Sequence, residues 1–261
     1  MSDFLETMAV RSAERAAAAG TFASADFDKP VVPLTLGAFD IIAEIKDRSP
    51  AEGKLGVSDQ VSRADRAAAY AAGGAAAISV LTEPSRFDGE LAHLEEVVAA
   101  APDTPVMRKD FLVEPVQVLE ARKAGASGVL LIAAMLNDAK LAEMLSCAFE
   151  HGMFVLLEAF DEDDLRRSAL FVDNVPGNLL VGVNTRNLRT LDVDPERLRN
   201  LAECLPNATC VAESGLHEPI DAARVAGWGY RMALVGTALM RSEDPAALVT
   251  AMREAGATAC S

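Results

Sequence analysis

The chain has 261 residues, of which 51% are hydrophobic and 24% are charged, and its formal net charge is −15. This composition excludes a disordered chain and is enough for one large α/β domain. The negative charge argues against nucleic-acid and anionic-membrane partners, because both need a basic patch. Met1–Thr21 lacks the apolar core of a signal peptide and no run approaches a membrane span, so we expect a cytoplasmic protein.

Short apolar runs alternate with amphipathic stretches along the chain. The runs predict strands at Ile41–Ile45, Ala76–Leu81, Pro105–Met107, Gly128–Ile132, Phe154–Leu157, Leu179–Val183, Thr209–Ala212 and Met232–Val235. The stretches predict helices at Val61–Ala72, Leu91–Ala100, Pro115–Ala124, Asn137–His151, Glu162–Phe171, Pro195–Leu205, Glu218–Ala226 and Pro245–Ala255. Pro195 begins one helix, and Gly125 and Gly227 follow the ends of two others, as helix boundaries favour.

This order of elements predicts a single α/β domain over residues 1–261, a (β/α)₈ TIM barrel. The strands are too apolar to face water on one side, which favours a parallel sheet covered by helices. A doubly wound open sheet is the alternative, because strand counts taken from one sequence easily err by one or two. Asp3–Ala19 precedes the first strand and is predicted to be an extra helix, so residues 1–38 form an N-terminal extension capping the barrel.

The first predicted strand carries charge. Glu44 and Lys46 share one face of the run, because side chains of a strand alternate, and the motif continues to Ser49-Pro50. A buried charge is costly unless it is paired or used. The pair is therefore either a structural ion pair or part of a functional site.

Polar residues recur at the ends of the later strands. They include Lys109, Glu158, Asn184, Arg186, Glu213 and Ser214. Each alone could be a capping or packing residue, but the carboxyl ends of barrel strands meet at one mouth, where enzymes of this fold place their chemistry. Carboxylates and ammoniums crowded together shift one another's pKa values, which suits general acid–base catalysis.

Glycine turns follow the last two strands. Gly215 comes after strand seven, and Gly236-Thr237 comes after strand eight. In many barrels these loops hold a phosphate through backbone N–H groups, and glycine permits the close approach. Two ordinary βα turns are the alternative, but their position on adjacent strands seven and eight favours phosphate binding. Ser49 and Arg186 could add donors. The four cysteines and three histidines match no metal-binding spacing, so we expect no metal site.

Several of these segments together resemble the indole-3-glycerol phosphate synthase family, in order from about Phe4 to Ala255. They are Ile42-Ala43-Glu44-Ile45-Lys46 with Ser49-Pro50, Ser79-Val80-Leu81-Thr82-Glu83, Arg108-Lys109-Asp110-Phe111, Gly182-Val183-Asn184-Thr185-Arg186-Asn187-Leu188 and Ala212-Glu213-Ser214-Gly215. The resemblance implies a carboxy-lyase of tryptophan biosynthesis without cofactor or metal. It would act on the phosphosugar 1-(2-carboxyphenylamino)-1-deoxyribulose 5-phosphate and form indole-3-glycerol phosphate, carbon dioxide and water.

The resemblance also implies roles for individual residues. Lys109 would be the general acid on the substrate ketone, and Glu158 would act as acid or base in dehydration. Lys46 would contact the substrate carboxylate, with Glu44 orienting it. The implied catalytic set is Glu44, Lys46, Lys109, Glu158 and Asn184. The implied substrate-binding set is Phe87, Phe111, Leu131, Arg186, Glu213 and Ser214. The implied phosphate-binding set is Ser49, Gly215, Gly236 and Thr237.

Other interpretations remain open. A Schiff-base aldolase using Lys46 or Lys109 and a non-catalytic phosphosugar-binding paralogue are the main alternatives, while a phosphoribosylanthranilate isomerase would need cysteine where Lys46 stands. The chain departs from the family pattern at Asp47, where we expect the extra charge to weaken phosphate binding, and at Phe160 and Thr237. We expect a monomer, with at most weak association with other enzymes of the pathway.

Overall fold

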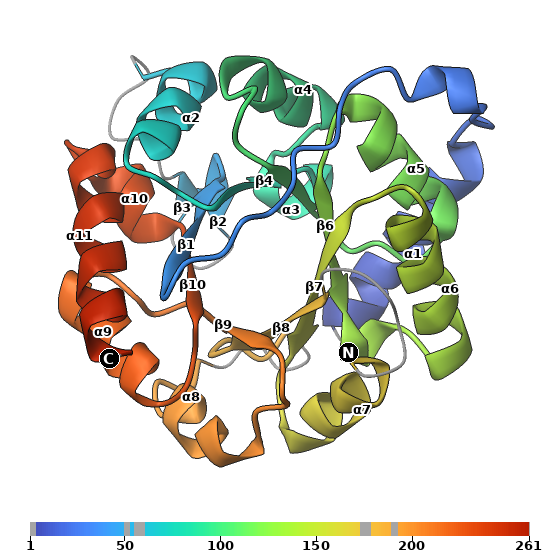
Figure 1. The fold of residues 1–261 in the computed structure, drawn as a ribbon. Helices are drawn as coiled ribbons and strands as arrows, with labels where there is room; N and C mark the ends of the chain where they lie inside the picture. The colour runs from blue at the N-terminus through green and yellow to red at the C-terminus, as the bar shows by residue number, and fades with distance from the viewer. Residues whose placement is uncertain (1–3, 50–52, 55–60, 173–178, 189–192, 261) are drawn as a thin grey trace.

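The structure is a computed structural model that describes residues 4–49, 53–54, 61–172, 179–188 and 193–260. In this part of the chain eight parallel strands close a barrel in the order β1-β10-β9-β8-β7-β6-β5-β4, which confirms the predicted TIM barrel over the open sheet (Figure 1). The barrel strands are β1 (Asp40–Ile45), β4 (Ala77–Leu81), β5 (Val106–Lys109), β6 (Gly128–Ile132), β7 (Phe154–Ala159), β8 (Leu179–Asn184), β9 (Thr209–Glu213) and β10 (Met232–Val235).

Helices surround the barrel (Figure 1). They are α2 (Arg63–Ala72), α4 (Leu91–Ala100), α5 (Pro115–Ala124), α6 (Asp138–Glu150), α7 (Glu162–Val172), α8 (Arg197–Asn200), α9 (Pro219–Gly227) and α11 (Pro245–Ala259). Proline opens α5, α9 and α11, where the missing N–H costs nothing. Among the described helices, none combines the length and the apolar character needed to cross a membrane.

The helix predicted at Pro195–Leu205 is shorter in the structure. After α8 the chain tightens into the 3₁₀ turn η3 (Ala202–Cys204), and Leu205 is extended with ψ 132°. Pro206 follows directly, and a residue before proline is driven out of the helical region. The proline therefore accounts for the extended backbone of Leu205, whereas the change from α8 to the 3₁₀ turn comes before it, between Asn200 and Ala202.

Short elements in the loops escape prediction because they are too brief to show periodicity. They are α3 (Pro84–Phe87), α10 (Thr237–Arg241), the antiparallel hairpin of β2 (Arg48–Ser49) and β3 (Gly53–Lys54), and the 3₁₀ turns η1 (Ser24–Asp26) and η2 (Ala133–Met135). Of these, α3, α10, β2–β3 and η2 follow the carboxyl ends of barrel strands. They shape the mouth of the barrel.

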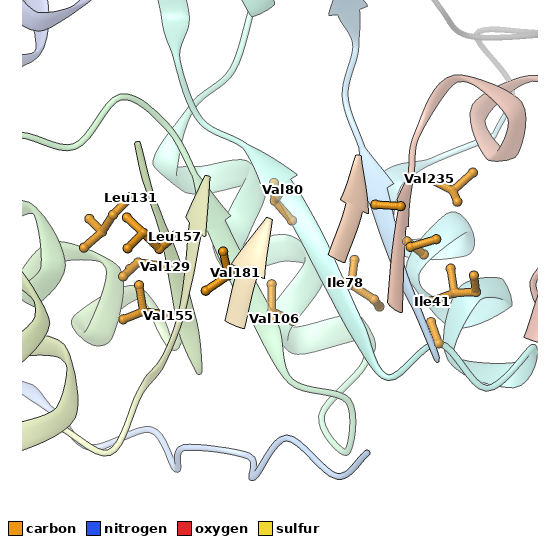
Figure 2. Packing of buried hydrophobic residues seen from close by; sticks show 14 of the residues in the cluster. Ile41, Ile78, Val80, Val106, Val129, Leu131, Val155, Leu157, Val181 and Val235 are labelled. Carbon is orange, nitrogen blue, oxygen red and sulfur yellow. The ribbon is translucent and has the colours of Figure 1, made fainter. Parts of the chain in front are cut away.

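Alternate residues of each strand face the helices or the barrel interior. The outer face carries a layer of aliphatic side chains, in which Val155 and Leu157 of β7 pack with their neighbours (Figure 2). The inner face fills the lower barrel with larger groups such as Phe154 and Met107. A methyl group at Gly128 would overlap the Phe154 ring, so this glycine gives the ring its space. The barrel is therefore a packed core below its mouth.

The N-terminal helix α1 (Phe4–Ala18) lies over the mouth. Leu5 and Met8 are buried in the cluster that fills the barrel interior. The Phe4 ring meets the Phe111 ring edge-to-face, with 5.8 Å between centroids. The extension thus contributes side chains to the same end of the barrel at which the strands finish.

A buried ion-pair network ties α1 to the loops. Arg15 Nη2 lies 2.7 Å from Asp110 Oδ1, and Arg15 Nη1 lies 3.7 Å from Glu83 Oε1. Both carboxylates are buried, and Arg108 and Thr82 also bond Asp110 Oδ2. Because a buried carboxylate is costly when unpaired, these contacts fix both α1 and the backbone that follows β5.

Candidate active site

A cavity of about 420 Å³ opens at the carboxyl ends of the strands. All five residues of the predicted catalytic set line it: Glu44, Lys46, Lys109, Glu158 and Asn184. These side chains come from β1, β5, β7 and β8, or from the residue directly after β1. Residues far apart in the sequence meet here because parallel strands end at one rim of the barrel.

The charged groups form a connected chain across the cavity floor. Glu44 Oε1 lies 2.6 Å from Lys46 Nζ, and Glu44 Oε2 lies 3.4 Å from Lys109 Nζ. Lys109 Nζ is also 3.9 Å from Glu158 Oε2. Glu44 therefore orients both lysines, rather than Lys46 alone. The first strand's charges belong to this site, and the structural ion pair is only part of their role.

The same contacts set the protonation of these groups. Burial alone would lower the pKa of Lys109, but Glu44, Glu158 and Glu213 outweigh it, and this pKa rises above its ordinary value. Burial alone would raise the pKa of Glu44, but Lys46 and Lys109 outweigh it, and this pKa falls. At neutral pH Lys109 is thus an ammonium and Glu44 a carboxylate.

Glu213 is not among the residues that line the cavity, and its contact with a substrate stays a prediction. Its carboxylate lies behind the wall, where a methyl group at Gly182 would overlap Glu213 Oε1. Burial, followed by the charge of Glu158, raises the pKa of Glu213 well above its ordinary value. The absence of a side chain at Gly182 lets the Glu213 carboxylate lie against β8.

Asn184 is held by the turn after β9. Ser214 Oγ donates to Asn184 Oδ1 at 2.8 Å, and the backbone N–H of Arg186 donates to the same oxygen at 3.0 Å. Ser214 adopts a left-handed backbone with φ 68°, an uncommon conformation for a residue with a side chain. Ser214 and Arg186 both line the cavity, as predicted.

The predicted phosphate turns lie at the same cavity. Gly215, Gly236 and Thr237 all line it. A methyl group at Gly236 would overlap the Glu44 carboxylate and lie 2.8 Å from Lys46 Nζ. A side chain at this position would therefore displace the ion pair beside it, besides any effect on a phosphate. The backbone of Ser49 belongs to β2, and its side chain lies outside the described residues.

An apolar wall stands opposite the charged floor. The Phe87 and Phe111 rings lie 6.1 Å apart between centroids, and both line the cavity, as predicted. The prediction for Leu131 is wrong, because its side chain points to the helices, beside Leu157 (Figure 2). Its neighbours Leu130 and Ile132 line the cavity instead. A shift of one residue along a strand moves a side chain to the opposite face.

The sequence interpretation missed three apolar residues that line the cavity, Phe4 of α1 and Leu130 and Ile132 of β6. Strict alternation from Gly128 would have placed Leu130 and Ile132 inside the barrel. Nothing in the local sequence of Phe4 signals its place, because only the packing of α1 brings it there. Among the described residues, no cluster of three His, Cys, Asp or Glu side chains is arranged to bind a metal ion.

Asp47 lies outside the cavity lining. Arg63 binds its carboxylate, and His93 Nδ1 lies 3.8 Å from Asp47 Oδ2. Arg48, the other basic residue nearby, pairs with Asp88 at 3.7 Å. The charge of Asp47 is thus compensated by α2, and the expectation that it opposes a substrate phosphate loses its physical basis.

A closed (β/α)₈ barrel with lysines and carboxylates at its strand ends defines a TIM-barrel enzyme with an acid–base site. The chain belongs to the indole-3-glycerol phosphate synthase family, whose model matches residues 20–252. It is 45% identical to the indole-3-glycerol phosphate synthase of Nocardioides sp., covering 88% of this chain and 87% of that protein. The protein of that name from Methanopyrus kandleri is 46% identical, over 83% of each chain.

Solved structures support the fold. A 3-hexulose-6-phosphate synthase superposes with a TM-score of 0.64 at 18% identity, covering 83% of this chain and 99% of that one. The tryptophan synthase α subunit of Legionella pneumophila superposes with a TM-score of 0.58 at 14% identity, over 98% of each chain. At such identities the likeness concerns the barrel alone.

Proposed function

We propose that the cavity converts 1-(2-carboxyphenylamino)-1-deoxyribulose 5-phosphate into indole-3-glycerol phosphate, carbon dioxide and water. The reaction belongs to tryptophan biosynthesis and requires ring closure, decarboxylation and dehydration in one site. The observation that carries the proposal is the placement of Lys109 between Glu44 and Glu158, facing an apolar aromatic wall. This arrangement offers a proton donor, a second acid–base group and a dry surface for an aromatic substrate.

Lys109 serves ring closure. As the aromatic carbon attacks the ketone, negative charge develops on the ketone oxygen, and the ammonium of Lys109 supplies the proton. Its raised pKa keeps it protonated throughout the neutral range, held in place by Glu44. A positioned acid of this kind contributes roughly 10²–10⁴-fold in rate. The same raised pKa disfavours the Schiff-base aldolase, which needs a neutral amine.

The apolar wall and Lys46 serve decarboxylation. Phe87, Phe111 and Leu130 would pack against the substrate ring and remove water from around its carboxylate. Lys46 Nζ lies at the cavity, 2.6 Å from Glu44 Oε1, where it can meet that carboxylate when the substrate binds. Loss of carbon dioxide then restores the aromatic ring, with the C–C bond electrons returning to it.

Glu158 serves dehydration, and the glycine turns serve the phosphate. Glu158 stands two strands from Lys109 around the barrel, so it can reach the hydroxyl that leaves after ring closure. Gly215, Gly236 and Thr237 would receive the phosphate, with backbone N–H groups as donors, and Arg186 would supply positive charge.

Single-turnover reactions with the purified chain test the proposal. The wild-type chain should form indole-3-glycerol phosphate from the substrate. Lys109→Met should leave the substrate unconsumed, whereas Glu158→Gln should accumulate a decarboxylated, still-hydroxylated ring. Accumulation of the cyclised species by Lys109→Met, or return of substrate alone by Glu158→Gln, would show that these roles are wrong. Absence of product from the wild-type chain would reject the function itself.

Location, assembly state and cofactor use follow from the same proposal. We place the enzyme in the cytoplasm as a monomer acting on a small phosphosugar without a cofactor, with at most weak contacts to other enzymes of the pathway. Sedimentation of the purified chain would test the monomer, and activity after exhaustive dialysis against chelator would test the lack of a cofactor or metal.

A further inference from the structure

Two buried carboxyl groups lie next to each other behind and within the cavity wall. Glu158 ends the inward-facing set of β7, Glu213 ends β9, and each residue is 1% exposed. None of their four carboxylate oxygens has a hydrogen-bond partner among the described residues. Two carboxylates are both acceptors, so they cannot bond to each other until a proton supplies the missing donor. Buried polar groups left unsatisfied in this way call for a functional explanation.

The strand between them explains why they meet. Glu158 is in register with Gly182 of β8, and Glu213 is in register with Asn184 of the same strand. A methyl group at Gly182 would overlap Glu213 Oε1, so the Glu213 carboxylate occupies the space that the missing side chain leaves. A side chain at Gly182 would therefore displace the Glu213 carboxylate from its present place.

Charge balance favours one proton on this pair. Ion pairs connect Glu44 and Glu158 with the ammoniums of Lys46 and Lys109, and Glu213 interacts with Lys109 and Glu158, so three carboxylates face two ammoniums. Full ionisation would leave one negative charge buried, which is costly, and a single proton removes it. The raised pKa of Glu213, caused by burial and then by Glu158, agrees with this balance. When two carboxyl groups share a site, each disfavours ionisation of the other, and one pKa of the pair is raised.

We propose that Glu158 and Glu213 share one proton across Gly182, so that Glu213 is a positioning residue that supplies the acid–base group of dehydration. The inference rests on the function proposed above and deepens it. Glu213 does not line the cavity, and the shared proton gives it a role in the reaction through Glu158.

The shared proton balances the dehydration step. The O–H bond of the pair breaks as the leaving hydroxyl takes its proton, and the C–O bond electrons depart with the oxygen as water. The ring carbon next to the site of departure then loses its proton to the now fully ionised pair, and the C–H bond electrons form the ring double bond. The pair therefore acts first as acid and then as base, and it ends the step holding one proton, as it began.

The surroundings of the pair contain few other charges. Lys109 of β5 and Glu44 of β1 influence Glu213, with Lys46 beyond them. The described residues near the carboxyl ends of β6, β8 and β10 are uncharged. They are Ile132, Gly182, Asn184 and Leu234. The charged or titratable side chains elsewhere on the cavity lining are Asp110, Arg186 and His217.

The pH dependence of dehydration tests the proposal. In single-turnover reactions of the wild-type chain, the rate of dehydration should fall as the pH rises through the upper apparent pKa of the pair. In Glu213→Gln, Glu158 has no second carboxyl group beside it, only Lys109. The pH at which the dehydration rate falls should therefore be lower than in wild type by about 1 pH unit or more. Gly182→Ala keeps both carboxyl groups and should also lower the pH at which the dehydration rate falls. Val183→Ala is the matched control, because this neighbour faces the helices and its loss should leave the profile in place.

Infrared spectroscopy of the free enzyme gives a readout independent of catalysis. At pH 7 the wild-type chain and Val183→Ala should show a protonated carboxyl band that Glu213→Gln lacks. An unchanged pH profile in Glu213→Gln, or identical wild-type and Glu213→Gln bands, would overturn the shared proton. A wild-type chain that forms no indole-3-glycerol phosphate would instead overturn the proposed function, and the band would still decide the protonation. Should Gly182→Ala fail to fold, Glu213→Gln and the band decide the outcome alone.

Discussion

The two faces of the barrel wall are built by alternate residues of the same strands, yet they follow opposite rules. On β7, Val155 and Leu157 face the helices in a continuous aliphatic layer with every group satisfied by packing. On the same strand Phe154 and Leu156 face inward, and the next inward residue is Glu158, whose carboxylate oxygens have no hydrogen-bond partner in the described structure. Two successive residues of one strand therefore have opposite effects: Leu157 stabilises the fold, and the buried carboxylate of Glu158 destabilises it.

This difference indicates how the molecule divides stability and function. The outer layer removes apolar surface from water, which is the main favourable term in folding. The upper inner layer instead buries carboxylates and ammoniums at a cost that the outer layer must offset. Strain and unsatisfied groups of this kind concentrate at functional sites in proteins.

Neighbouring residues of β7 provide the strongest test of this division. Glu158→Gln should lower the rate of product formation by roughly 10²–10⁴-fold, because it removes a positioned acid–base group, while the folded state persists. Leu157→Ala should lower the free energy of unfolding by about 2–5 kcal/mol through a cavity in the outer layer, with kcat close to wild type. Urea unfolding and single-turnover assays on both variants measure the two effects. Equal losses of activity and stability in both variants would contradict the division.

Two glycines sharpen the comparison, one inside and one outside the barrel. Gly236→Ala should displace the Glu44–Lys46 pair, because the new methyl would lie against both groups, and kcat should fall by about 10²-fold. Gly227→Ala is the matched control: it ends α9 with no atom within 4 Å of the new methyl, so it should stabilise the fold by about 0.5–1 kcal/mol. Steady-state kinetics and thermal unfolding test both. A Gly236→Ala variant with wild-type kcat would show that the ion pair tolerates displacement.

The cost of the buried carboxyl pair should appear in the pH dependence of stability. Because the pKa of Glu213 is raised in the folded state, the folded chain holds a proton that the unfolded chain releases above the ordinary value. This contribution is complete below the ordinary pKa and is lost as the pH rises toward the folded pKa. Glu213→Gln cannot titrate, so its stability relative to wild type should grow between pH 5 and pH 8, by at most about 1.4 kcal/mol per pH unit. A difference that stays constant in urea unfolding at both pH values would contradict the raised pKa.

The smallest effect is expected on the outer rim. Asp47→Asn removes a half-exposed partner of Arg63, so the free energy of unfolding should fall by about 0–1 kcal/mol. KM should not change, because Asp47 does not line the cavity. Asp163→Asn, which breaks the exposed pair with Arg166 on α7, is the matched control. A clear decrease in KM for Asp47→Asn, absent in the control, would show that this charge does act on the substrate phosphate.

Much of the fold and of the site could be predicted from the sequence because the signals are local. Each barrel strand is a short apolar run, and each polar residue at its end follows the run directly, so order along the chain is enough to bring Lys109, Glu158 and Asn184 to one rim. The helix predicted at Pro195–Leu205 shows the limit of periodicity, since one apolar pattern covers both the short helix α8 and the 3₁₀ turn η3 that follows it. The short loop elements α3 and α10 lacked enough residues to show any pattern.

By itself the sequence determined the barrel, the identity of its charged strand ends and the family to which the chain belongs, because strand burial and motif order are written in neighbouring residues. Only the tertiary structure decided which distant groups meet. It brought Phe4 into the cavity and paired Asp47 with Arg63. It also placed Glu213 of β9 against Gly182 of β8 and near Glu158 of β7. No local feature of the sequence signals this contact. The physical reason is that such contacts depend on closure of the barrel, which sets the register between strands and the space left by one missing side chain.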